Sequence, residues 1–184
     1  MTEPRAVFSN PAGDARGAAA AYTAALLDVL GDRDPLAVQG ELVGAVEQSV
    51  TGLAVDLLRT PERAGKWSIA EVVVHLADTE LVYGYRYRMV LAHDAPSIEG
   101  FDQDAWARQL RYVDADVERE LERLRVLRAS NLALLHSLDD AQRNRFGVHA
   151  ERGNESVWMI ARLGAAHDLV HRAQIARIRD AVTR

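Results

Sequence analysis

Apolar residues recur at helical spacing along most of the chain, and no stretch of alternating apolar and polar residues is sustained. Glycines, prolines and short polar stretches separate the periodic segments. The pattern predicts helices over residues 14–30, 36–58, 68–92, 102–106, 116–138 and 155–182, with 139–153 as an irregular polar connection. The expected fold class is therefore an all-α bundle whose helices pack around one core.

The start of the helix over 68–92 carries the strongest local signal. Ser68 and Glu71 have the spacing of a capping box, in which each side chain accepts a hydrogen bond from the backbone N–H of the other residue. Trp67, directly before the cap, is placed to pack against Val72 in the following turn. The first turn of this helix, and with it the direction of its faces, is thus well determined.

The last predicted helix carries two histidines on its buried face. In heptad register, His171 falls in the row of Val157 and Ile178, and His167 falls in the row of Ile160. Side chains at positions i and i+4 have Cβ atoms roughly 5–6 Å apart, so both imidazoles can bind one metal ion at about 2.0–2.1 Å. A single histidine on such a face is more often a hydrogen-bonded core residue. Two in consecutive turns make a metal site an equal alternative.

His75 is the third candidate ligand, because it lies on the inward face of the helix over 68–92. At a rise of 1.5 Å per residue it stands about 10 Å past the start of its helix, and His167 stands about 18 Å past the start of the last helix. The three histidines can therefore share one level of the bundle. A catalytic metal with open coordination positions, a structural metal, and three core histidines without metal all fit this placement.

Several other polar residues are candidates for the same region or for the surface. Thr79 and Arg86 share the face of His75 and are candidates to bind a cofactor beside the metal, with a buried polar contact or a rim position as the alternative. His93, His136 and His149 fall in or beside predicted loops and are expected to face solvent. Neither the His-Glu-x-x-His pattern nor paired Glu-x-x-His patterns occur in the chain.

Composition and charge narrow the possible partners. The chain has 184 residues, a net charge of −5 and no cluster of basic residues, which argues against nucleic acid as a partner. It has no cysteine, so a thiol taking part in its chemistry would come from a small molecule. No stretch reaches the ~18 apolar residues of a membrane span. We expect a cytoplasmic protein with a flexible lead over 1–13 and one domain over 14–184.

Three segments together resemble the DinB/YfiT-like superfamily of metalloenzymes: KWSIAEVVVHLADTE over 66–80, FDQDAW over 101–106, and HDLVH over 167–171 followed by Gln174 and Ile175. The resemblance implies a four-helix bundle with a divalent metal on His75, His167 and His171. The metal is Zn, Ni, Fe or Mn, because all four accept imidazole ligands. The resemblance also implies transferase or isomerase chemistry that uses a small thiol such as bacillithiol or mycothiol. The additional helix over 14–30 occurs in part of the superfamily and could form a pocket entrance or a homodimer contact.

The expected function is that of a metal-dependent enzyme in which the metal acts as a Lewis acid on a thiol, with a small molecule as substrate. The alternatives are a hydrolase that activates water and a bundle whose metal only stabilises the fold. A thiol transferase would direct basic groups such as Arg86 or Arg88 toward the metal. A hydrolase would place a carboxylate there, with Asp78, Glu80 and Asp168 as candidates. A structural site would have a fourth protein ligand.

Overall fold

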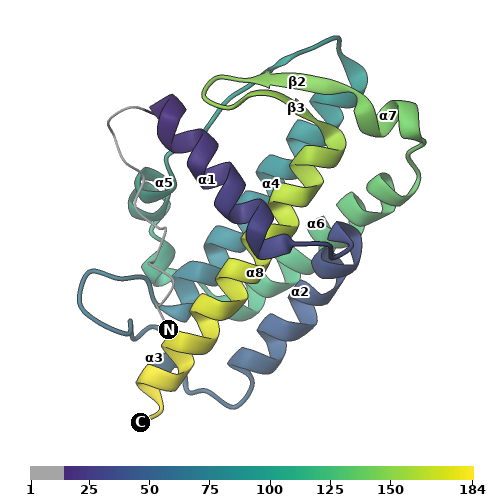
Figure 1. Ribbon diagram of the computed structural model, residues 1–184. Helices are drawn as coiled ribbons and strands as arrows, with labels where there is room; N and C mark the ends of the chain where they lie inside the picture. The colour runs from purple at the N-terminus through teal and green to yellow at the C-terminus, as the bar shows by residue number, and fades with distance from the viewer. Residues whose placement is uncertain (1–14) are drawn as a thin grey trace.

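The structure is a computed structural model that describes residues 15–184, and it confirms an all-α bundle with an additional N-terminal helix (Figure 1). The predicted lead over 1–13 and Asp14, the predicted cap of the first helix, lie outside the described residues. The helices are α1 Ala15–Leu30, α2 Pro35–Val50, α3 Val55–Leu58, α4 Ile69–Ala92, α5 Gln103–Gln109, the 3-10 helix η1 Tyr112–Asp114, α6 Val117–His136, α7 Asp140–Asn144 and α8 Val157–Val182.

Four long helices, α2, α4, α6 and α8, pack against one another, and α1 lies along α8 (Figure 1). Helix α8 runs through the middle of this arrangement and contacts α1, α2 and α4. Among the described residues, no helix has the length and apolar character that a membrane crossing requires. Because α4 and α8 are in contact, side chains from both helices can form a common site.

The predicted start of α4 is confirmed. Ser68 Oγ accepts a hydrogen bond from the backbone N–H of Glu71, and Glu71 Oε2 accepts one from the backbone N–H of Ser68 at 2.8 Å. Trp67 packs against the apolar cluster that contains Val72. The capping box satisfies two backbone donors that the helix itself cannot.

The helix predicted over 36–58 was wrong in its second part. Helix α2 ends at Val50, and Gly52 adopts a φ of +79°, a left-handed conformation that glycine tolerates and that ends a helix. The chain then re-enters a short helix, α3, before the loop that leads to α4. The apolar pattern continued across this break, so periodicity alone did not locate it.

The connection over 139–153 was predicted as irregular, and this was also wrong. It contains α7 and most of a hairpin of β2 (Phe146–His149) and β3 (Gly153–Ser156), and β2 also pairs in parallel with β1 (Ser97–Ile98). Figure 1 shows the hairpin across the end of the bundle where α4 finishes and α8 begins. A Cβ on Gly147 would lie 2.8 Å from the Ile98 side chain, so β1 and β2 approach this closely only with glycine there.

The core consists of apolar clusters on either side of a polar layer. On α4, α6 and α8 the buried residues toward the two ends of each helix are mostly apolar, and those between them include charged and imidazole side chains. The main apolar cluster at one end includes Leu42, Val46, Ile69, Val72, Val73, Leu76, Leu121, Leu124, Ile175 and Ile178; the cluster at the other includes Leu36, Tyr87, Val90, Ile98, Leu135, Val157 and Ile160. The polar layer between them holds the candidate site.

Candidate metal centre

Three histidines from two helices converge in the polar layer. His75 comes from α4, and His167 and His171 come from consecutive turns of α8, as their spacing predicted. Their side chains are buried, with 1%, 8% and 4% of their surface exposed. His167 Nε2 lies 3.0 Å from His75 Nε2 and 3.0 Å from His171 Nε2. The three nitrogens that can bind a metal therefore point at one another.

The imidazole N–H groups cannot satisfy all the contacts between the three Nε2 atoms, whereas a bound cation can. His171 Nδ1 donates to Gln174 Oε1 at 2.7 Å, so a neutral His171 presents a lone pair on Nε2. A neutral His167 can place at most one hydrogen on its own Nε2, and one hydrogen cannot form two linear hydrogen bonds to two different imidazoles. A cation bound by all three lone pairs satisfies every one of these contacts. The donors present therefore fit a divalent metal.

Burial keeps these imidazoles in the form that binds metal. It lowers the pKa of His75 and of His167 well below the usual value, and the positive charge that a neighbouring imidazole would carry lowers each further. Burial likewise lowers the pKa of His171 to about 4, although the hydrogen bond to Gln174 opposes the shift. All three are therefore neutral near pH 7, and metal binding does not first have to displace protons.

The spacing of the nitrogens also suits one ion. Two imidazole nitrogens that each bind an ion at about 2.0–2.1 Å stand roughly 2.9 Å apart in octahedral and 3.4 Å apart in tetrahedral geometry. The separations of His167 Nε2 from the other two nitrogens, both 3.0 Å, lie within this range, and all three ligand atoms lie within 4.8 Å of one another. Among residues 15–184, the metal-binding group consists of these three histidines, and no fourth His, Cys, Asp or Glu joins it. Three protein ligands leave a coordination position open, as in catalytic zinc sites.

Gln174 and Trp67 each contact one of the three histidines. The Gln174 carbonyl oxygen fixes the orientation of the His171 ring through its Nδ1. The Trp67 ring centroid lies 5.0 Å from that of His75 at an interplanar angle of 53°, so an indole covers one side of the imidazole. His75 Nδ1 and His167 Nδ1 are buried and have no hydrogen-bond partner among the described residues.

Replacing Gln174 by leucine is expected to weaken zinc binding about ten- to a hundredfold, because the His171 ring loses the acceptor that orients it. Competition against a chromogenic chelator measures this affinity. Gln174→Glu keeps an acceptor at the same position and should retain tight binding, and Gln109→Leu on the exposed face of α5 serves as the matched control. Equal affinities for Gln174→Leu and wild type would show that Gln174 has no orienting role.

The three carboxylates considered as general bases are all engaged in other contacts. Asp78 accepts hydrogen bonds from the Tyr112 hydroxyl and, at 2.7 Å, from Arg123 Nη1. Arg128 binds Asp168 through Nη1 and Nη2, at 2.5 and 3.1 Å, and its Nη2 also lies 2.8 Å from Glu80 Oε2. Arginine or tyrosine side chains thus occupy all three carboxylates, and among the described residues none of them joins the three-histidine group.

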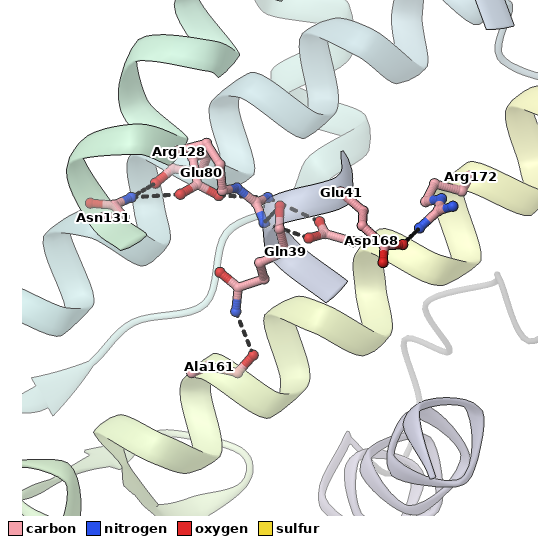
Figure 2. A network of polar contacts seen from close by, with 8 residues as sticks. All are labelled: Gln39, Glu41, Glu80, Arg128, Asn131, Ala161, Asp168 and Arg172. Atoms are coloured by element: carbon pink, nitrogen blue, oxygen red, sulfur yellow. Dashed lines mark hydrogen bonds and ion pairs between the residues drawn. The ribbon is translucent and has the colours of Figure 1, made fainter. Parts of the chain in front are cut away.

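Arg128 is the centre of this buried network, which Figure 2 shows in detail. Asn131 donates to Glu80 Oε1 at 2.7 Å, and the Gln39 backbone oxygen accepts from Arg128 at 3.3 Å. With Glu80 and Asp168 ionised, the network carries one negative charge more than positive.

The two residues proposed to bind a cofactor have different surroundings. Thr79 is buried, and its hydroxyl has no hydrogen-bond partner among the described residues. Arg86 is also buried; its Nη2 donates to the Glu99 backbone oxygen at 2.6 Å and its guanidinium lies 5.8 Å from the Tyr83 ring centroid. Arg88 instead contacts Asn131 and Ser130 on α6. The structure therefore directs neither arginine to the three histidines.

Sequence reasoning missed His149 and the ion-paired Arg128. His149 was expected to face solvent but is 2% exposed, because β2 turns its Gly147 and His149 positions inward and leaves Phe146 and Val148 outside. Arg128 and Asn131 continue the helical row of Leu124 in α6, and a polar residue in such a row was the available signal.

A bundle whose centre holds three buried histidines with converging nitrogens belongs to the metal-binding class of helical bundles. The family model described as the DinB superfamily matches residues 43–175, so this chain belongs to the DinB superfamily. The resemblance stated from its motifs is thereby confirmed.

Named relatives and a solved structure agree with this assignment. The chain is 31% identical over 144 residues to "Putative metal-dependent hydrolase GK0616" of Geobacillus kaustophilus, covering 78% of this chain and 80% of that protein. It is 29% identical over 142 residues to "Putative metal-dependent hydrolase YfiT" of Bacillus subtilis, covering 74% and 79%. The solved structure of YfiT, titled a "probable metal-dependent hydrolase with an unusual four-helix bundle topology", superposes with a TM-score of 0.73 at 28% identity over 78% of this chain and 83% of that one.

Proposed function

We propose that this protein is a metal-dependent hydrolase of a small molecule, with a divalent ion held by His75, His167 and His171. The observation that carries the proposal is the set of three converging, neutral imidazoles without a fourth ligand among the described residues. A structural site would be closed by a fourth ligand. The relatives that cover most of this chain carry hydrolase names, which supports water as the nucleophile.

A divalent ion bound there supplies Lewis acidity, which makes bound water acidic enough to react near pH 7. The chain itself orients the imidazole ligands and surrounds them with buried side chains. Gln174 holds the His171 ring, the burial of His75 and His167 keeps both rings neutral, and Trp67 excludes solvent from one side of His75. Because a divalent ion on three imidazoles would make a bound water more acidic without a carboxylate, the pairing of Asp78, Glu80 and Asp168 does not prevent hydrolysis.

Thiol-dependent transfer or isomerisation is the second candidate, and the paired carboxylates favour it. A free thiol with a pKa of about 8.5 is far more acidic than water at about 15.7 and ionises without a carboxylate base. The absence of cysteine from the chain means that the thiol would be a co-substrate such as bacillithiol or mycothiol. Zn, Ni, Fe and Mn all accept three imidazoles.

One assay separates the two candidates. Protein reconstituted with Zn, Ni, Fe or Mn is incubated with para-nitrophenyl acetate and with a chlorinated nitrobenzene, each with no thiol, glutathione, bacillithiol or mycothiol. Hydrolysis of the ester without thiol, absent from His167→Ala and retained by His93→Ala at an exposed position, is the expected result. Conjugation that requires a thiol, without ester hydrolysis, would contradict the hydrolase proposal and establish the transferase.

A further inference from the structure

His149 lies away from the metal centre and carries a buried donor without an acceptor. Its side chain is 2% exposed, and its Nδ1 accepts a hydrogen bond from the Glu151 backbone N–H at 3.2 Å. A neutral imidazole whose Nδ1 accepts must carry its hydrogen on Nε2. His149 Nε2 is buried and has no partner among the described residues. Since buried N–H groups in folded proteins almost always have an acceptor, either in the protein or in a bound molecule, this one leaves a place for a bound acceptor.

Arg86 brings an uncompensated positive charge to the same region. Its side chain is 7% exposed, yet within residues 15–184 its one hydrogen bond goes to a backbone oxygen, that of Glu99, and no carboxylate forms an ion pair with it. The guanidinium also lies over the Tyr83 ring. A buried guanidinium without an anionic partner is costly, and the remaining donors are suited to an oxyanion.

Arg152 lies near both residues. It binds Glu155 through two hydrogen bonds, at 2.5 and 3.1 Å, so this pair is neutral. Burial lowers the pKa of His149, and the positive charges of Arg152 and Arg86 lower it further, while Glu155 and Glu151 oppose them. Arg86 binds the backbone oxygen of Glu99, the residue after Ile98, which pairs with His149, and Arg152 follows His149 in the hairpin turn. Glu151 is exposed, so among the buried side chains one positive charge, that of Arg86, remains to be matched.

We propose that His149, Arg86 and Arg152 bind a small carboxylate between the β2–β3 hairpin and the C-terminal half of α4. One carboxylate matches the single unpaired charge and supplies acceptors both for His149 Nε2–H and for the free donors of Arg86. Helix α4 and strand β2 are in contact, and Figure 1 shows the hairpin over the end of α4, so one small ligand can contact both elements.

The proposed carboxylate site lies closer to the C-terminal end of α4 than the metal centre does. Thr79 and Tyr83 occupy the turns between His75 and Arg86, and the Tyr83 ring stands edge-on to His167 with centroids 6.4 Å apart. The buried Thr79 hydroxyl without a partner lies in this interval. The inference that the bound carboxylate is part of the substrate rests on the proposed function. Carboxylate binding itself requires no metal.

The test uses full-length protein from which metal has been removed with a chelator, so that no ion can bind the probe. Acetate is titrated while the imidazole signals of His149 are followed by NMR, with sodium chloride at equal ionic strength as reference and inorganic phosphate as a second arm. The His149 signals are expected to shift saturably with acetate and not with chloride. His149→Phe and Arg86→Met are each expected to weaken acetate binding by about tenfold or more.

Arg88→Met is the matched control, because it removes the same charge from the same helix at an exposed position and should leave acetate affinity within about twofold. His149 signals that do not move with acetate, or phosphate binding more tightly than acetate, would overturn the proposal. The wild-type titration decides this even where Arg86→Met does not fold. A protein that binds acetate but has no metal-dependent activity would refute the proposed function and leave the carboxylate site established.

Discussion

His167→Ala protein is expected to purify with almost no divalent metal, whereas the wild type carries about one ion per chain. His167 Nε2 lies 3.0 Å from both of the other candidate ligand atoms. Its loss leaves only His75 and His171, without the ligand that contacts both. We expect zinc affinity to fall by about two orders of magnitude or more. Elemental analysis of protein purified without added chelator measures the occupancy.

His149→Phe is the matched control for this experiment, because His149 is equally buried but lies outside the three-histidine group. It should retain the metal content of the wild type. Metal that persists in a variant with alanine at His75, His167 and His171 would show that the ion binds elsewhere in the protein.

Arg128→Met is expected to lower the free energy of unfolding by about 3–5 kcal/mol, the largest stability effect that we predict for one substitution. The change leaves Glu80 and Asp168 buried, close together and without a cation. Urea denaturation of metal-free protein measures the difference. Arg125→Met, one turn away on the exposed side of α6, removes two solvent-exposed ion pairs, with Glu47 and Glu122, and should cost less than about 1 kcal/mol.

The destabilisation by Arg128→Met should be smaller at pH 5 than at pH 8. Burial raises the pKa of Asp168 to about 6 even in the presence of Arg128, which opposes the shift, and removal of the guanidinium raises it further. The folded variant then binds a proton that the unfolded chain, with an Asp pKa of about 3.9, does not bind at pH 5, so its stability falls as pH rises. A loss independent of pH would contradict a role of Arg128 in charge compensation.

The long helices and the three histidines could be predicted because both follow from local spacing. His167 and His171 are four residues apart on the inward face of α8, and His75 follows a capping box that determines which face of α4 is buried. Helical periodicity then implies that the three side chains point to the same core. Packing sets the orientations of the imidazole rings, and residue spacing alone does not predict them.

The hairpin and the buried charges could not be predicted in the same way. Strand β2 has its apolar Phe146 and Val148 outside and Gly147 and His149 inside, which inverts the pattern that identifies a half-buried strand. Its pairing with β1 joins segments about 50 residues apart through only two residue pairs. Arg128 resembles a solvated helix charge until its partners, which come from two other helices, are known.

The position of Trp67 gives the site an optical signal of its own. Its indole ring lies 5.0 Å from that of His75, at the N-terminal end of α4. An open-shell ion such as Ni²⁺ at the histidines would quench the emission of this indole at contact range, whereas Zn²⁺, with its filled d shell, would leave it bright. The other two tryptophans belong to α5 and to the start of α8. Fluorescence of the unlabelled protein can therefore distinguish which kind of ion it has taken up.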